Sequence, residues 1–156
     1  MVRFSFAPSR AGYALVELLA VLAIVGLLAG LGFPRIRSSL ERARVARAVG
    51  DIRAIQADLM ALESQGQPLP ATLDAIGRGT IRDPWGRPYV YVPFPAGRRV
   101  PPGARRDRFL VPVNSTFDLY SLGRDGQSAP AFTAAPSLDD VVRANDGGYI
   151  GLAANY

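Results

Sequence analysis

The hydrophobic and polar positions divide the chain into stretches of different character. Residues 13–33 form an apolar run that a single charged residue, Glu17, interrupts. After Pro34 the apolar positions recur mostly three or four residues apart, at Ile36, Leu40, Val45, Val49, Ile52, Ile55 and Leu59. This spacing is typical of an amphipathic helix. We therefore expect one long helix from about Tyr13 to Glu63, bent near Pro34.

The second half of the chain consists of short apolar segments that glycine and proline separate. Residues 64–70 have the composition of a loop that ends the helix, and residues 71–76 that of a short helical turn. β-Branched and aromatic residues predict strands at 89–92, 108–113 and 117–121. A sheet of about three strands must bury one face, and the helical stripe offers a surface for it. We expect an α+β fold in which the long N-terminal helix packs on a small antiparallel sheet.

The apolar run has the length of a membrane-spanning helix. At about 1.5 Å per residue, residues 13–33 extend over about 30 Å, the thickness of a bilayer core. A secretory signal peptide would have a shorter apolar core, followed by an Ala-x-Ala-like site that this chain lacks after the run. A plain membrane anchor fits the length but leaves Glu17 unexplained, because an ionisable group inside a membrane is costly. Glu17 is therefore either a functional residue or a carboxylate at the membrane interface.

The composition excludes several kinds of chemistry. The chain has no Cys and no His, which removes disulfides, Cys-based zinc sites, Cys nucleophiles and His general bases. A metal site would have to be built from oxygens, which favours calcium or magnesium. The net charge is +5, but the arginines that carry it are scattered, and we expect no nucleic-acid binding. No nucleophile–base pair stands out, and we do not expect an enzyme.

The start of the apolar run carries a recognisable motif. Residues 12–17 have the sequence GYALVE and follow a short leader that contains two arginines. This arrangement resembles the cleavage and methylation motif of type IV prepilins and type II secretion pseudopilins. The resemblance implies that prepilin peptidase cuts between Gly12 and Tyr13, that Tyr13 becomes N-methylated, and that Glu17 serves in assembly. Pro34 stands where many of these proteins carry a helix-bending proline.

The resemblance also implies a division of the chain. Residues 1–12 are a cleaved leader, residues 13–34 a transmembrane and filament-core helix, and residues 35–156 a periplasmic pilin-like domain. The positive-inside rule alone would place that domain in the cytoplasm, because five arginines follow the apolar run within residues 35–47. The resemblance places it in the periplasm, since the peptidase meets the leader on the cytoplasmic side. We therefore expect a single-pass protein of the bacterial inner membrane.

Two segments of the second half resemble the major pseudopilin of type II secretion. They read DPWGRPY at residues 83–89 and FDLYSLGRDG at residues 117–126, and an Asp-Asp-Val triplet follows at residues 139–141. Taken as sequence alone, the first segment is a turn, with Trp85 packing against the sheet.

In this family, the loop after the second segment binds calcium. The resemblance implies a site formed by the carbonyls of Leu122 and Val141 and the carboxylates of Asp125 and Asp140. Calcium takes six to eight oxygens, so these donors together with water would suffice. A solvated acidic loop without metal is the alternative.

The resemblance implies a structural subunit of a periplasmic pseudopilus that drives protein export in type II secretion. Its partners would be prepilin peptidase, other pseudopilin subunits, the inner-membrane assembly platform and the membrane. In the filament, Glu17 would neutralise the Tyr13 amine of a neighbour, because an unpaired buried charge is expensive. A type IV pilin or competence pseudopilin is the alternative in the same class. A calcium-binding module with an incidental anchor is a further alternative.

Overall fold

The computed structural model describes residues 10–94 and 100–156 of a chain that divides into two compact units, Met1–Glu41 and Arg42–Tyr156. Helix α1 covers Arg10–Ser64 and belongs to both units. The strands are β1 (Val90–Pro93), β2 (Phe117–Ser121), β3 (Val141–Ala144) and β4 (Tyr149–Leu152). Short 3-10 helices lie at η1 (Leu73–Ile76), η2 (Ala135–Ser137), η3 (Asn145–Gly147) and η4 (Ala153–Asn155). The α+β class predicted from the sequence is confirmed.

Helix α1 ends close to its predicted terminus. The chain turns at Gly66, whose φ of 72° lies in the left-handed region that glycine adopts without strain. The amides of Gly66 and Gln67 donate to the carbonyls of Glu63 (2.9 Å) and Leu62 (3.0 Å). These bonds satisfy carbonyls that have no partner within the last turn. The predicted end at Glu63 is confirmed to within one residue.

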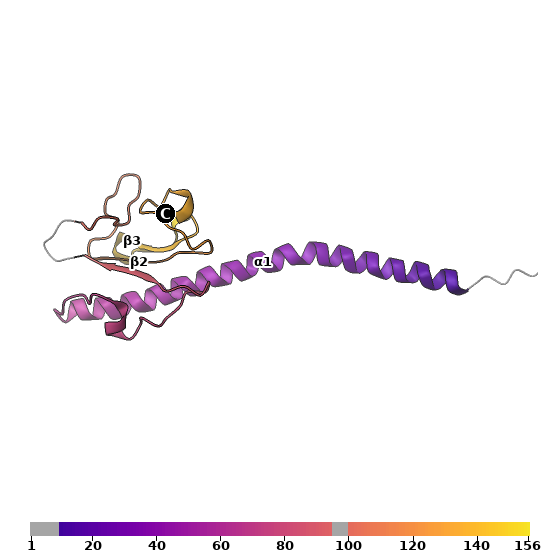
Figure 1. Ribbon diagram of the computed structural model, residues 1–156, viewed down its shortest axis with the longest axis horizontal. Coiled ribbons are helices and arrows are strands. Elements are labelled where there is room, and N and C mark those ends of the chain that lie inside the picture. Colours follow the sequence, from indigo (N-terminus) through magenta and orange to yellow (C-terminus); the bar gives the residue numbers. More distant parts are fainter. Residues whose placement is uncertain (1–9, 95–99) are drawn as a thin grey trace, which may run out of the picture. The chain divides into compact units, whose positions relative to one another are not determined.

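In the C-terminal unit, one face of α1 packs on the sheet (Figure 1). Four side chains of this face are fully buried, namely Ala48, Ile52, Ile55 and Leu59. They form the main core together with Phe117 and Leu119 of β2 and Val141 of β3. Burying one such large apolar side chain stabilises the fold by about 1.5–3 kcal/mol. The predicted stripe is therefore the surface on which the sheet packs.

The four strands form an antiparallel sheet in the order β1-β2-β3-β4. Successive residues of a strand point to opposite faces. Val141 of β3 accordingly joins the core on the helix side, whereas Val142 and Ala144 join a second cluster on the other side. Val113, Phe132 and Ala153 complete that second cluster. Loops and the C-terminal tail thus cover the face of the sheet that α1 leaves open.

The strand predicted at Arg108–Val113 is wrong. The segment lies outside the sheet, and its apolar side chains Phe109, Leu110 and Val111 are exposed. It folds back locally, because the amide of Asp107 donates to the Leu110 carbonyl (3.0 Å). Strand β2 pairs instead with β1 and β3, and β4 pairs with β3 in turn. The predicted sheet of about three strands is therefore a four-stranded one, completed by the C-terminal tail.

Candidate functional site

The N-terminal motif lies at the start of α1. Gly12 and Tyr13 fall within the helix, but the side chain of Tyr13 lies outside the described part of the chain, as do residues 1–9 of the predicted leader. Glu17 is described and is exposed. It is the only charged residue among positions 14–28. Cleavage after Gly12, methylation of Tyr13 and the assembly role of Glu17 stay predictions.

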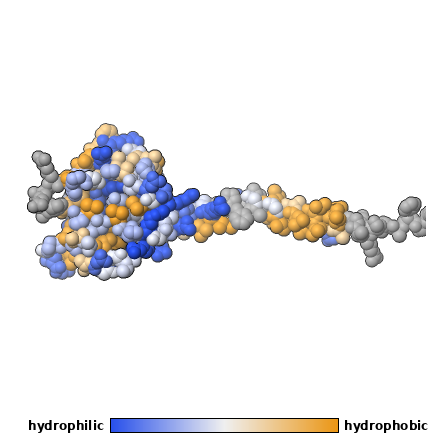
Figure 2. Space-filling view, viewed as in Figure 1, coloured by the Kyte–Doolittle hydropathy of each residue, from blue (hydrophilic) through white to orange (hydrophobic). Residues whose placement is uncertain are grey.

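The helix around Glu17 is apolar on every side. Its exposed large apolar side chains are Leu15, Val16, Leu18, Leu19, Val21, Leu22, Ile24, Val25, Leu27 and Leu28. Figure 2 shows them as a hydrophobic surface along this part of α1. A helix that is hydrophobic all round requires an apolar environment. A single carboxylate in such a surface needs a cationic partner once that surface is covered.

Within the part of the chain that the structure describes, no helix has a stretch both long enough and apolar enough to cross a membrane. Pro34 lies inside α1, but its side chain is outside the described residues, and the predicted bend there stays a prediction.

The DPWG segment forms a turn, as predicted, and the structure shows that the turn is built around a buried carboxylate. Asp83 Oδ1 accepts from the amides of Trp85 (3.0 Å) and Arg87 (2.7 Å). Its other oxygen, Oδ2, accepts from the Ser121 hydroxyl at the end of β2 (2.6 Å). Trp85 packs against the main core. Asp83 therefore joins this turn to the strand from which the predicted metal loop leaves.

We expect Asp83→Ala to lower the free energy of unfolding by about 3 kcal/mol, because two amides and one buried hydroxyl lose a charged acceptor. Asp83→Asn keeps an oxygen for the two amides and is expected to cost less. Chemical denaturation followed by circular dichroism measures both. A loss below about 0.5 kcal/mol for the alanine variant, the usual size for surface substitutions, would contradict this role of Asp83.

The loop after β2 is held against the segment before β3. The Asp139 carboxylate accepts from the amides of Arg124 (2.8 Å) and Asp125 (3.0 Å). Gly123 has a φ of 61°, and a Cβ at this position would lie 2.3 Å from the Asp139 carbonyl oxygen. The close approach therefore requires glycine. The structure thus brings together the two segments in which the calcium donors were predicted.

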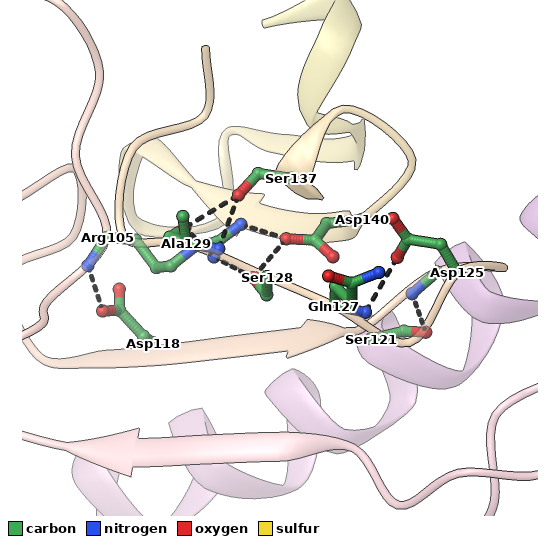
Figure 3. Close-up of polar contacts among 10 residues, drawn as sticks. Arg105, Asp118, Ser121, Asp125, Gln127, Ser128, Ala129, Ser137 and Asp140 are labelled. Atoms are coloured by element: carbon green, nitrogen blue, oxygen red, sulfur yellow. Dashed lines mark hydrogen bonds and ion pairs between the residues drawn. The ribbon is translucent and has the colours of Figure 1, made fainter. Parts of the chain in front are cut away.

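The predicted donors at the first segment are engaged within the loop itself. The Leu122 carbonyl accepts from the Gly126 amide (3.1 Å). Asp125 is exposed, and its Oδ1 accepts from the Gln127 amide (2.8 Å), as Figure 3 shows. Both contacts are ordinary turn hydrogen bonds.

Asp140 is in a different environment, because it is fully buried and paired with an arginine. Its Oδ2 accepts from Arg105 Nη2 (2.6 Å) and from the Ser128 hydroxyl (2.5 Å) (Figure 3). Its Oδ1 has no hydrogen-bond partner among the described residues. Burial raises the pKa of the Asp140 carboxyl, and the contacts to Ser128 and Arg105 work against this rise. Val141, the fourth predicted donor, is buried at the start of β3.

Arg105 was missed as a site residue by the sequence analysis, which counted it only among the scattered arginines. Residues 95–99 lie outside the described part, but Arg105 itself is only 2% exposed. Its guanidinium lies over the rings of Tyr120 (4.3 Å) and Phe132 (5.1 Å) and donates to the Ala129 carbonyl (2.6 Å). The adjacent Arg106 is exposed, and no sequence signal separates the two arginines.

These donors do not fit a calcium ion. The described residues contain no group of three or more acidic side chains that could hold a metal. A guanidinium already occupies one oxygen of Asp140, and a divalent cation beside it would meet like charge in a buried place. The calcium site therefore stays a prediction, and the arrangement around Asp140 argues against it.

Several known proteins are similar to this chain, and each of those named next is called type II secretion system core protein G. The protein from Pseudomonas aeruginosa is 32% identical over 139 residues, which cover 76% of this chain and 86% of the relative. That from Aeromonas hydrophila is 28% identical over 140 residues, covering 76% and 86%. That from Vibrio cholerae is 27% identical over 129 residues, covering 81% and 88%. No family model and no solved structure matches the chain.

Proposed function

The chain belongs to the family of type II secretion system core protein G, the major pseudopilin, and from this membership we propose that it is a structural subunit of a periplasmic pseudopilus. In this proposal, prepilin peptidase removes residues 1–12, Tyr13 is methylated, and the N-terminal part of α1 first anchors the protein in the inner membrane and then forms the filament core. The domain that begins near residue 35 lies in the periplasm.

The observation that carries the proposal is the lone carboxylate in an exposed apolar helix. Glu17 is the only charge among residues 14–28, and the apolar side chains around it are exposed. Cleavage after Gly12 would create an amine at Tyr13, four residues from Glu17. When helices of neighbouring subunits pack together, an ion pair between that amine and Glu17 would neutralise both charges. Because the cost of leaving either charge unpaired is high, the pair would select one stagger between subunits.

The partners follow from the same proposal. They are prepilin peptidase, further copies of this chain, minor pseudopilins and the assembly platform of the inner membrane. The role is structural and not catalytic. The relatives that match are all named for secretion, and no observation favours the alternative of a type IV pilin or competence pseudopilin.

We expect the mature protein to begin at a methylated Tyr13. Mass spectrometry of the protein extracted from membranes measures this directly. Gly12→Asp replaces the glycine of the cleavage motif and is expected to leave the leader attached. An intact Met1 in cells that contain prepilin peptidase, or a cut beyond Phe33, would overturn the proposed processing.

A further inference from the structure

The buried pair of Arg105 and Asp140 occupies the region where the family resemblance implies calcium. We propose that the guanidinium of Arg105 is a resident cation that takes the place of a bound calcium ion, so that this domain folds and holds its loop without metal. This inference concerns the folding of the C-terminal unit and does not rest on filament assembly.

The first support is the state of the Asp140 carboxylate. It is fully buried, and its negative charge faces Arg105 Nη2 at 2.6 Å. A buried carboxylate needs a cation or strong hydrogen bonds to offset the loss of its hydration. Arg105 and the Ser128 hydroxyl provide both at Oδ2. The charge that a calcium ion would otherwise neutralise is thus already balanced.

The second support is that Arg105 is built into the domain. Its guanidinium lies over the rings of Tyr120 and Phe132, and it donates to the Ala129 carbonyl. Its backbone amide donates to Asp118 Oδ2 (2.7 Å). A planar guanidinium can stack on rings and donate in its plane at the same time, which an ammonium cannot. The packing therefore holds the charge in one place.

The third support is that a second arginine binds the carbonyls of the loop. Arg87 Nη1 donates to the Gly123 carbonyl (2.8 Å), and Nη2 donates to the Arg124 carbonyl (3.4 Å). The amides of Arg124 and Asp125 donate to the Asp139 carboxylate. These carbonyls and amides of residues 123–125 thus have protein partners, and they attach the loop to the segments before β1 and β3 without an ion.

One oxygen remains open to a competing cation. Asp140 Oδ1 is buried and lacks a hydrogen-bond partner among the described residues. The other carboxylate of the predicted donor set, that of Asp125, is exposed. Since calcium takes six to eight oxygens, these two carboxylates would leave most of its coordination to water and carbonyls. The experiment must therefore measure calcium binding directly.

The decisive comparison uses the unmutated full-length chain, purified in detergent and melted in millimolar calcium or in excess chelator. Because a ligand stabilises only the state that binds it, we expect the two melting temperatures to agree within about 1 °C. We also expect isothermal titration calorimetry to detect no calcium binding. A melting temperature that rises with calcium, and that loses this rise in Asp125→Ala, would overturn the proposal. This comparison does not depend on whether any Arg105 variant folds.

A matched pair of variants tests the role of the guanidinium. Arg105→Met keeps much of the side-chain volume but leaves Asp140 buried and unpaired, so we expect a melting temperature lower by roughly 10 °C. Arg106→Met changes the exposed neighbour and is expected to melt like the unmutated protein. Adding Asp140→Asn to Arg105→Met removes the unpaired charge and should recover part of the loss. Unchanged melting of Arg105→Met would contradict the proposal.

Discussion

Glu17→Ala is expected to remove filament formation while leaving membrane insertion intact. The substitution makes the apolar helix more apolar, so it does not weaken the proposed anchoring in the bilayer. It removes the only charge among residues 14–28. The Tyr13 amine of a neighbouring subunit would then enter the filament core without a partner, at a cost of several kcal/mol for each subunit added. Because that cost recurs at every step of assembly, we expect a loss of filaments and not a partial reduction.

Assembly and insertion are measured separately. Cells that overproduce the protein are sheared, and electron microscopy detects the filaments that are released. Immunoblotting of the membranes measures insertion. Glu17→Asp keeps the charge on a shorter side chain and is expected to form fewer filaments than the unmutated protein but more than the alanine variant. Normal filaments from Glu17→Ala would show that the carboxylate has no role in assembly.

Phe117→Ala is expected to lower the free energy of unfolding by about 3–5 kcal/mol. Phe117 is fully buried in β2, where it joins the main core. Its ring lies 5.7 Å from that of Tyr91 and beneath the guanidinium of Arg143, at 3.9 Å. Truncation would leave a cavity and remove the ring that faces the buried cation. The predicted loss is a large part of the total stability of a typical domain, about 5–15 kcal/mol.

Phe109→Ala is the matched control, because it removes the same side chain from a position that is 94% exposed. We expect a change within about 0.5 kcal/mol. Chemical denaturation of the two variants under the same conditions gives the comparison. Similar losses for both would mean that Phe109 is covered in solution and that Phe117 does not have the place assigned to it.

Phe117 and Phe109 also show the limit of predicting strands from the sequence of this protein. Both stand in short apolar and aromatic segments, and both segments were predicted as strands. Only β2 is one, because it pairs with β1 and β3 on either side and meets α1 on one face. Which segments pair depends on contacts between residues far apart in the chain. Local composition does not encode those contacts.

The buried arginines illustrate the same limit for charged side chains. Arg105 and Arg143 are each 2% exposed, whereas Arg106 is exposed. Arg143 donates to the Phe117 carbonyl (2.9 Å) and to Gln56 Oε1 of α1 (2.9 Å), and its burial lowers its pKa. A sequence predicts arginines to be on the surface, since burial is costly without partners. The partners of these two come from distant segments.

The sequence by itself determined the features that depend on residues close together along the chain. The extent of α1, its apolar first part, the Val45–Leu59 stripe, the turn at Asp83 and the family all follow from local spacing and motifs. Only the tertiary structure decided the partner of β2, the place of the tail in the sheet and the pairing of Asp140 with Arg105. The physical reason is that helix periodicity and turn chemistry act over a few residues. The pairing of β2 with β3 and the neutralisation of a buried charge instead join groups that are far apart in the chain, as from Tyr120 to Val142 and from Arg105 to Asp140.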